Sequence, residues 1–307
     1  MIQKNQEFDV SNALPRIRWN PSMAFVFALA IPSILVAAAT EPSQPKLQIV
    51  NAGVQRAEDG PFVPHDYHFL PGDYLHFEFA VSGFKISGDA YAESRQISLH
   101  YTVEVVDDKN IALAPPESGK IRDDIAPEDK KWIPKRRASF LLPSYIAAGT
   151  YTARITVEDL FANTKASAEY PFQIGGRAIK PVTSLTLQNF RFLRSEQDGP
   201  ALEVPAYRAG AAIWARFDIT GFQVGPANSV SLQYGVKVLR PDGSQIFAQP
   251  EAANEKIATS YPPQFVPGVL NITTTPNLAG GEYTMVVAVH DLIGSQDRES
   301  SYKFRIE

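Results

Sequence analysis

The 307-residue sequence contains no cysteine. It therefore forms no disulfide framework, holds no metal through thiolates, and offers no cysteine nucleophile or lipid-modified cysteine. Neither positive nor negative charge is in large excess, since the formal net charge is -4. No basic surplus points to a nucleic-acid partner. The hydrophobic fraction of 44% and the aromatic fraction of 11% indicate a globular chain of one large or two ordinary domains.

Long apolar runs are missing except at residues 23–39, which read MAFVFALAIPSILVAAA. This run follows Arg16 and Arg18 and ends in small residues before a polar stretch. That layout predicts a secretory signal peptide over residues 1–39 and an exported product that is periplasmic, cell-surface or secreted. The alternatives are an uncleaved membrane anchor, since the run is near the short limit for a span, and a buried core helix. No further membrane span is expected.

Helical periodicity is absent after residue 40, where no window of a dozen residues keeps a 3.6-residue repeat. The pattern alternates instead: from residue 97 to 105 the odd positions are apolar and the even positions are polar. Short strands separated by turn residues predict antiparallel β-sandwiches. The expected strands lie near 47–55, 73–82, 96–106, 110–114, 138–142, 150–159 and 166–174, and near 184–193, 211–220, 229–239, 245–248, 269–274, 282–291 and 299–306.

Beyond the apolar run, the chain consists of two repeats of one sequence unit. Three segments align in order, with 18 identities in 51 positions, and their offsets shrink from 138 to 132 residues as loops shorten. The aligned pairs are 71–86 with 209–224, 97–105 with 230–238, and 149–174 with 281–306. This predicts one domain over 44–175 and another over 179–307, joined by the short Gly175-Gly176 link with limited freedom between them.

Residues 148–152 (AGTYT) and 280–284 (GGEYT) each open a predicted strand that ends in Asp-Leu before a hairpin. Both segments resemble the penultimate strand of immunoglobulin-like and fibronectin type III-like domains, in which a tyrosine hydroxyl bonds to preceding backbone. The resemblance implies buried corners at Tyr151 and Tyr283. The predicted fold class is all-β, with two tandem immunoglobulin-like antiparallel β-sandwich domains after an N-terminal signal segment. Such modules serve as spacers, adhesins or accessory domains.

Two histidines are close together only in the loop VPHDYHF, where His65, Asp66 and His68 could offer nitrogen and oxygen atoms to a divalent metal. No third histidine completes the set, so the site is a weak candidate and no metal or other cofactor is expected. Asp159 and Asp291 recur at the same place in the two units. We interpret each as an acceptor of backbone hydrogen bonds at the turn into the last hairpin, rather than as part of a catalytic carboxylate pair.

Charged residues are concentrated between residues 117 and 137, where most of the acidic residues precede most of the basic ones. We interpret this stretch as a solvated surface loop; the alternatives are a calcium loop or a docking surface for an anionic partner with Trp132 as its aromatic anchor. A second aromatic candidate is Trp214. The alternation places it on the outward face of its strand, beside Arg216 and Asp218. Either a loop covers it or it belongs to a contact surface for a protein or sugar ring.

No nucleophile elbow or phosphate-binding glycine loop is found, so no catalytic residue is predicted and the chain is not expected to be an enzyme. The favoured hypothesis is a non-catalytic extracytoplasmic binding or scaffold protein with a protein or cell-surface glycan partner. The alternatives are a carbohydrate- or cell-wall-binding accessory protein and a hydrolase built on loops. The predicted binding residues are Trp214, Arg216 and Trp132.

Overall fold

The computed structural model describes residues 46–307 except 89–94, 127, 130 and 198. In this part of the chain the regular elements are strands, apart from one three-residue 3-10 turn, Pro226–Asn228. The described residues belong to one compact unit. The all-β prediction is confirmed, and within the described ranges no helix has the length and apolar character needed to cross a membrane. The predicted signal segment lies outside the described residues.

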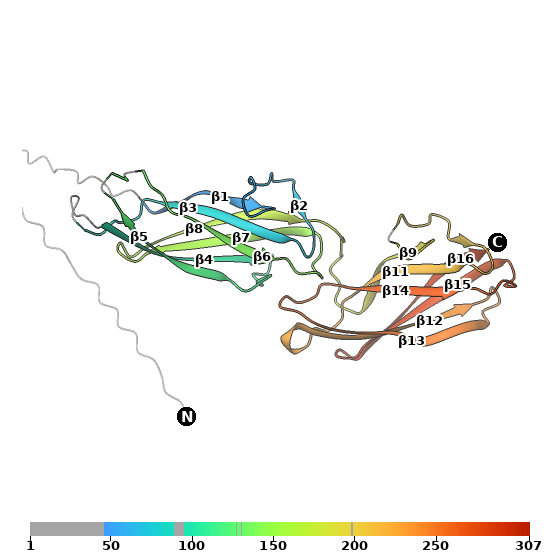
Figure 1. The fold of residues 1–307 in the computed structure, drawn as a ribbon. Coiled ribbons are helices and arrows are strands. Elements are labelled where there is room, and N and C mark those ends of the chain that lie inside the picture. Colours follow the sequence, from blue (N-terminus) through green and yellow to red (C-terminus); the bar gives the residue numbers. More distant parts are fainter. Residues whose placement is uncertain (1–45, 89–94, 127, 130, 198) are drawn as a thin grey trace, which may run out of the picture. The chain divides into compact units, whose positions relative to one another are not determined.

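The first sandwich consists of a three-stranded and a five-stranded sheet (Figure 1). The three-stranded sheet has the antiparallel order β1 (Gln48–Gln55), β3 (Tyr74–Ser82), β6 (Lys135–Leu141). The five-stranded sheet has the order β2 (His68–Phe69), β8 (Thr164–Ile174), β7 (Gly149–Asp159), β4 (Arg95–Val106), β5 (Glu117–Ile125). Only the short β2 runs parallel to its neighbour, β8.

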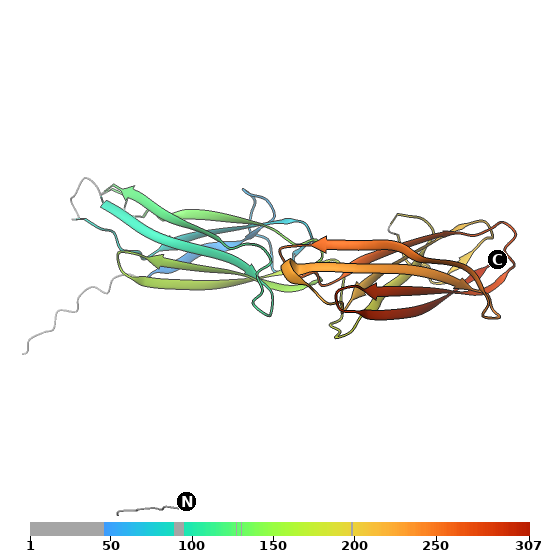
Figure 2. The same ribbon diagram turned by 90° about the horizontal axis from the view of Figure 1, so that it is seen from below.

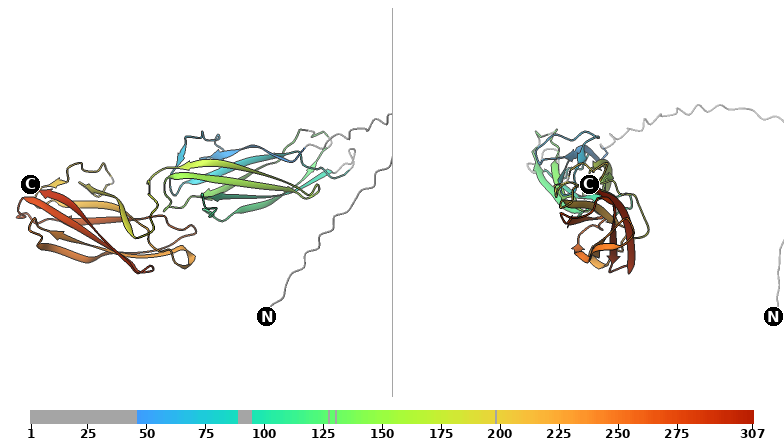
Figure 3. Two further views of the ribbon diagram at one scale, coloured as in Figure 1. Left: turned by 180° about the vertical axis from the view of Figure 1, so that it is seen from behind. Right: turned by 90° about the vertical axis from the view of Figure 1, so that its right-hand side faces the viewer.

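The second sandwich repeats this layout. Its three-stranded sheet has the order β14 (Val266–Thr273), β11 (Ala212–Thr220), β9 (Thr186–Leu193). Its five-stranded sheet has the order β10 (Ala206–Tyr207), β16 (Gln296–Ile306), β15 (Gly281–Asp291), β12 (Ser229–Leu239), β13 (Gln245–Ala258). Figure 2 shows β12 and β13 side by side in orange, and Figure 3 shows β15 and β16 paired in red. The predicted two-sandwich arrangement is confirmed; the domain boundaries themselves stay predictions.

The duplication extends to an irregularity in one strand pair. The register of β1 on β3 shifts between Val50 and Gly53, and the register of β9 on β11 shifts at the equivalent place. Each bulge contains an asparagine in the left-handed region, Asn51 at φ 47° and Asn189 at φ 51°. Asparagine tolerates this conformation better than most residues do. An offset of 138 residues therefore maps β1 and β3 onto β9 and β11 residue by residue.

The core of each sandwich is the inner face of its three-stranded sheet packed on the five-stranded sheet. On β3 the inward side chains of Leu75, Phe77, Phe79 and Val81 are completely buried. On β11 the equivalent side chains are apolar and almost completely buried as well. Because burial of a large apolar side chain contributes about 1.5–3 kcal/mol, these alternating positions fix which face of each strand turns inward.

One strand prediction and one loop prediction between residues 110 and 137 were wrong. The expected strand at 110–114 is only a bridge between Val106 and Ala112. The predicted surface loop begins with strand β5, which pairs with β4 along residues 117–125. Its inward positions, Ile121 and Ile125, are buried, whereas most of its other side chains are charged or small. Charged side chains suit an edge strand because they discourage pairing with other chains, and here they masked the period-two pattern.

The predicted tyrosine corners are confirmed. The hydroxyl of Tyr151 donates to the carbonyl of Ala147 at 2.9 Å, and that of Tyr283 donates to the carbonyl of Ala279 at 2.7 Å. Both side chains are buried. Each corner therefore ties the start of its strand to the loop before it.

The two recurrent aspartates act in turns, as predicted. Asp159 is fully buried; its Oδ1 accepts from the backbone N–H groups of Phe161 and Ala162 at 2.9 and 3.0 Å, and its Oδ2 accepts from that of Lys85 at 2.6 Å. Asp291 repeats this pattern, with three backbone donors from the equivalent positions. A buried carboxylate with three such partners is satisfied and fixes the hairpin.

Besides the Gly175-Gly176 link, a loop from the second half of the chain contacts the first sandwich. Tyr261 lies between β13 and β14, is 2% exposed, and packs in the first sandwich's core. Its hydroxyl donates to Asp107 Oδ2 at 3.0 Å. Gln264 Oε1 accepts from the backbone N–H of Ala147 at 2.6 Å. These bonds add constraints that the link sequence alone does not supply.

We expect Tyr283→Phe to lower the free energy of unfolding by roughly 0.5–1.5 kcal/mol, because the carbonyl of Ala279 would lose the hydrogen bond that the buried phenol donates. Tyr151→Phe should behave alike. Urea unfolding measures both. The matched control is Tyr74→Phe, whose parent side chain is 58% exposed and which should change little. A change of only a few tenths of a kcal/mol at both corners would show that the hydroxyl bonds contribute little.

Alkaline pH should destabilise the fold. Burial raises the pKa of Tyr151 and of Tyr207 to about 12. Because these values exceed the pKa of about 10 in the unfolded chain, the neutral phenols stabilise the fold fully below pH 10, and this contribution is lost as pH rises from 10 to 12. The urea midpoint should fall over this window. The double variant Tyr151→Phe/Tyr207→Phe should show a smaller fall, and an equal fall would contradict the assignment.

Candidate functional site

The outer faces of the two three-stranded sheets carry different residues in the two repeats. On β3 the outward positions hold Tyr74, His76 and Glu78, and the register places Ala212, Trp214 and Arg216 at the equivalent positions of β11. The predicted binding pair Trp214 and Arg216 therefore corresponds to His76 and Glu78. We take these two faces as the candidate functional surfaces.

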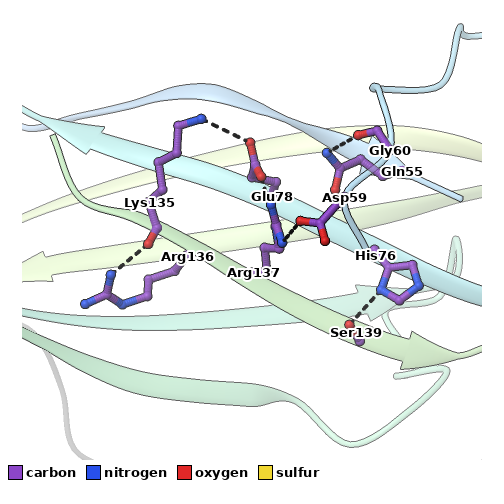
Figure 4. A network of polar contacts seen from close by, with 9 residues as sticks. All are labelled: Gln55, Asp59, Gly60, His76, Glu78, Lys135, Arg136, Arg137 and Ser139. Atoms are coloured by element: carbon purple, nitrogen blue, oxygen red, sulfur yellow. Dashed lines mark hydrogen bonds and ion pairs between the residues drawn. The ribbon is translucent and has the colours of Figure 1, made fainter. Parts of the chain in front are cut away.

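A charged network occupies the middle of the first outer face (Figure 4). Glu78 accepts from Arg137 Nε at 2.9 Å and lies 3.5 Å from Lys135 Nζ. Arg137 also pairs with Asp59 at 2.5 Å, and these two carboxylates raise the pKa of its guanidinium. The Glu78 side chain is only 11% exposed, and these partners satisfy its largely buried carboxylate. Gln55 holds the loop that carries Asp59, because its Nε2 donates to the carbonyl of Gly60 at 2.7 Å.

An aromatic and apolar area adjoins this network. The rings of Tyr74 and His76 are stacked, with centroids 6.3 Å apart and planes 20° apart. His76 Nδ1 lies 2.8 Å from Ser139 Oγ, which fixes the imidazole (Figure 4). Tyr74 is 58% exposed, and its cross-strand partner Leu141 is 52% exposed. The face thus offers a flat apolar area beside fixed charges, an arrangement that can contact another protein or a sugar ring.

The second outer face is more covered. Trp214 points outward, as predicted, but it is half-buried. The segment after β9 returns to this face, where Arg216 Nη2 donates to the carbonyl of Glu196 at 2.5 Å. Asp218, which the alternation places on this same face, is fully buried there, paired with Arg177 and 2.9 Å from Asn189 Nδ2. The segment that precedes β9 supplies Arg177 and so covers the carboxylate.

The predicted tryptophans do not form one site. Trp132 lies between β5 and β6 of the first sandwich, is 38% exposed, and meets Phe84 edge to face with centroids 6.4 Å apart. Trp214 belongs to the second sandwich. The nearby bases are partly paired, since Arg136 Nη2 lies 3.2 Å from Asp123 Oδ2. Trp132 therefore stays a separate candidate contact residue.

The weak metal candidates are not assembled into a centre. His65 and Asp66 lie exposed in the loop before β2, and His68 is exposed within β2. In the described part of the chain, no three histidine or acidic side chains are grouped closely enough to hold a metal ion.

Sequence reasoning missed the surface formed by Tyr74, Glu78, Arg137 and Leu141. Period-two alternation places Tyr74 and Glu78 on one face, but the pairing of β3 with β6 is needed to bring Arg137 and Leu141 beside them. No local signal in the sequence encodes that register.

No family model matches this sequence, and no curated protein matches it.

Distant likenesses to solved structures include the following three. The C-terminal domain of the Streptococcus pyogenes antigen I/II-family protein AspA has 10% identity over 83% of this chain and 98% of that one, with a TM-score of 0.28. The C-terminal domain of the Streptococcus agalactiae AgI/II polypeptide BspA has 11% identity over 83% and 99%, with a TM-score of 0.26. A family 123 glycoside hydrolase from Clostridium perfringens has 10% identity over 33% of this chain and 22% of that one, with a TM-score of 0.27. At these TM-scores, none of the likenesses assigns a function.

Proposed function

We propose that this protein is a non-catalytic, extracytoplasmic binding or scaffold protein built from two duplicated immunoglobulin-like or fibronectin type III-like sandwiches. The observation that supports this most is that the inner faces of the three-stranded sheets keep their apolar character between the repeats, whereas the outer faces do not. The inward positions of β3 and β11 are apolar in both repeats, whereas the outward positions of these strands and of their partners β6 and β14 differ. The outward pairs are Tyr74 and Ala212, His76 and Trp214, Glu78 and Arg216, Arg137 and Val269, Ser139 and Asn271, and Leu141 and Thr273.

The finer fold assignment rests on the two tyrosine corners and on the pairing of a three-stranded with a five-stranded antiparallel sheet. The extracytoplasmic location rests on the sequence of residues 16–39. In such an array each sandwich presents its own outer face, so we propose that the two faces meet different partners.

The recurrent acids favour a structural role over catalysis. Asp159 and Asp291 are each saturated by backbone donors within a turn. A carboxylate with its lone pairs so occupied is poorly placed to exchange protons with a substrate. The residues retained in both repeats therefore support folding, and the contact residues belong to the variable faces: Tyr74 and Leu141 on the first sandwich, Trp214 and Arg216 on the second, with Trp132 as an added anchor.

A second candidate function is carbohydrate or cell-wall binding. The specific observation in its favour is the exposed, stacked pair of Tyr74 and His76 beside the charges of Glu78 and Arg137. A sugar ring packs its apolar face on an aromatic ring while its hydroxyls bond to neighbouring polar groups.

The test compares binding of the labelled protein to peptidoglycan, to a glycan array and to an array of extracellular proteins. We expect Tyr74→Ala/Leu141→Ala to weaken the strongest interaction about tenfold or more, because truncation of central apolar contacts removes most of the binding energy. Protein ligands would support the first function, and glycan ligands the second.

The matched control is Leu292→Ala, which truncates a leucine 54% exposed on a hairpin of the second sandwich. It should bind like the parent protein. Unchanged binding by the double variant would remove the first outer face as a contact surface. Turnover of a substrate that is abolished by one carboxylate substitution would overturn the non-catalytic proposal.

A further inference from the structure

A cavity of about 280 Å³ enters the first sandwich between β1 and β8, with the loop from β1 to β2 as its third wall. Its lining is apolar and aromatic, and apart from the tyrosine hydroxyls only His65 contributes an ionisable group. The main lining residues are Ala52, Phe62, Val63, Pro64, Tyr67 and Tyr170. An apolar cavity of about 150 Å³ is enough to hold benzene. The space therefore accommodates an aromatic side chain.

The walls of this cavity are fixed by backbone bonds. The N–H of Val63 donates to the carbonyl of Val54 at 2.9 Å, which ties the loop to the edge of β1. The second sandwich closes its corresponding loop in the same way, with Leu202 donating to Phe192 at 3.0 Å. Tyr67 is held edge-on against a buried phenylalanine ring with centroids 5.0 Å apart. The cavity is thus preformed, which lowers the entropic cost of binding.

The second sandwich fills the equivalent place with its own side chain. The strand registers map Ala52 onto Phe190 and Tyr170 onto Tyr302. In the second sandwich Phe190 lies face to face on Tyr302, with ring centroids 3.4 Å apart and planes 3° apart. In the first, the small Ala52 leaves the corresponding side of Tyr170 to the cavity.

The core of the first sandwich places a different ring, that of Phe77, against Tyr170. Phe77, which packs near Tyr170, corresponds to Ala215 in the second sandwich. That difference is balanced on the neighbouring strand, where Ala138 opposes Phe77 and Leu270 opposes Ala215. The exchange of large for small residues is therefore compensated within the three-stranded sheet, and Phe77 contacts Phe79 and Tyr170 as Phe190 contacts the equivalent Phe217 and Tyr302. Phe77 meets Tyr170 with ring planes 58° apart rather than face to face, and the cavity still lies between Ala52 and Tyr170.

We propose that the cavity binds one aromatic side chain of a partner polypeptide, which stacks on Tyr170 as Phe190 stacks on Tyr302. A sugar fits this lining poorly, because its buried hydroxyls would find few hydrogen-bond partners. The inference specifies the partner of the proposed binding function. The cavity contains neither Tyr74 nor Leu141 of the outer face, so one experiment can contradict the cavity proposal and another the outer-face proposal.

The neighbouring strand indicates why the partner is a polypeptide. In the described part of the chain, β2 pairs with β8 only at Gln173 and Ile174, and the earlier residues of β8 pair with β7 alone. An extended segment paired along the part of this edge that precedes Pro171, which has no N–H to donate, would direct alternate side chains toward the space between the sheets. One aromatic side chain at such a position would enter the cavity beside Tyr170.

The test is ligand-observed saturation-transfer NMR on the full chain with N-acetyl-phenylalanine amide. We expect clear saturation transfer from the parent protein and at least a fivefold loss in Ala52→Phe, which places the ring of the second sandwich in the first. Ala248→Phe makes the same change at an exposed position of β13 and should leave the signal unchanged. Tyr170→Ala removes the stacking ring and should also lower the signal, which keeps the test valid if Ala52→Phe does not fold.

A strand-like peptide tests the polypeptide claim. Acetyl-Thr-Val-Phe-Val-Thr-amide should bind at least tenfold more tightly than N-acetyl-phenylalanine amide, and its Phe-to-Ala version should lose that gain. Equal affinity of the peptide and the single residue would overturn pairing along β8. No transfer to the parent protein, or equal transfer in Ala52→Phe and Ala248→Phe, would overturn the site. If N-acetylglucosamine binds and Ala52→Phe blocks this binding, the cavity binds a sugar and the proposal of an aromatic side chain is wrong.

Discussion

Burial of one face of each three-stranded sheet against a five-stranded sheet is the constraint on which the rest of the structure depends. It requires every second residue of β3 and β11 to be apolar, and it requires the summed volumes to fit. The exchange of Phe77 and Ala138 for Ala215 and Leu270 meets that requirement with different residues. The tyrosine corners and the aspartate turns then fix the loops at the ends of the strands.

The same constraint leaves the outward positions free to change after duplication. The first sandwich uses that freedom for an exposed apolar area beside the Glu78 and Arg137 pair, and the second for a half-buried tryptophan and an arginine. The space beside Tyr170 follows the same logic. In one repeat the chain fills it with Phe190, and in the other the equivalent residue is Ala52, beside the cavity.

Local signals in the sequence accounted for most of the fold. Period-two alternation predicted most of the strands, and the recurrence of Tyr151 and Asp159 predicted their roles because each bonds to backbone within a few residues. The misses required non-local knowledge. Strand β5 has only two buried isoleucines among charges, Asp218 is buried by an arginine that precedes β9, and the first outer face depends on the pairing of β3 with β6.

The most direct test of this division between inner and outer faces is the unfolding free energy of a variant whose first sandwich carries six outward residues of the second sandwich. The substitutions are Tyr74→Ala, His76→Trp, Glu78→Arg, Arg137→Val, Ser139→Asn and Leu141→Thr. The comparison is the single inward change Phe77→Ala, which should cost about 3–5 kcal/mol. We predict that all six outward changes together cost less than this one inward change in urea unfolding. An equal or larger loss from the outward exchange would contradict the account, because the outer face would then be part of what holds the sandwich together.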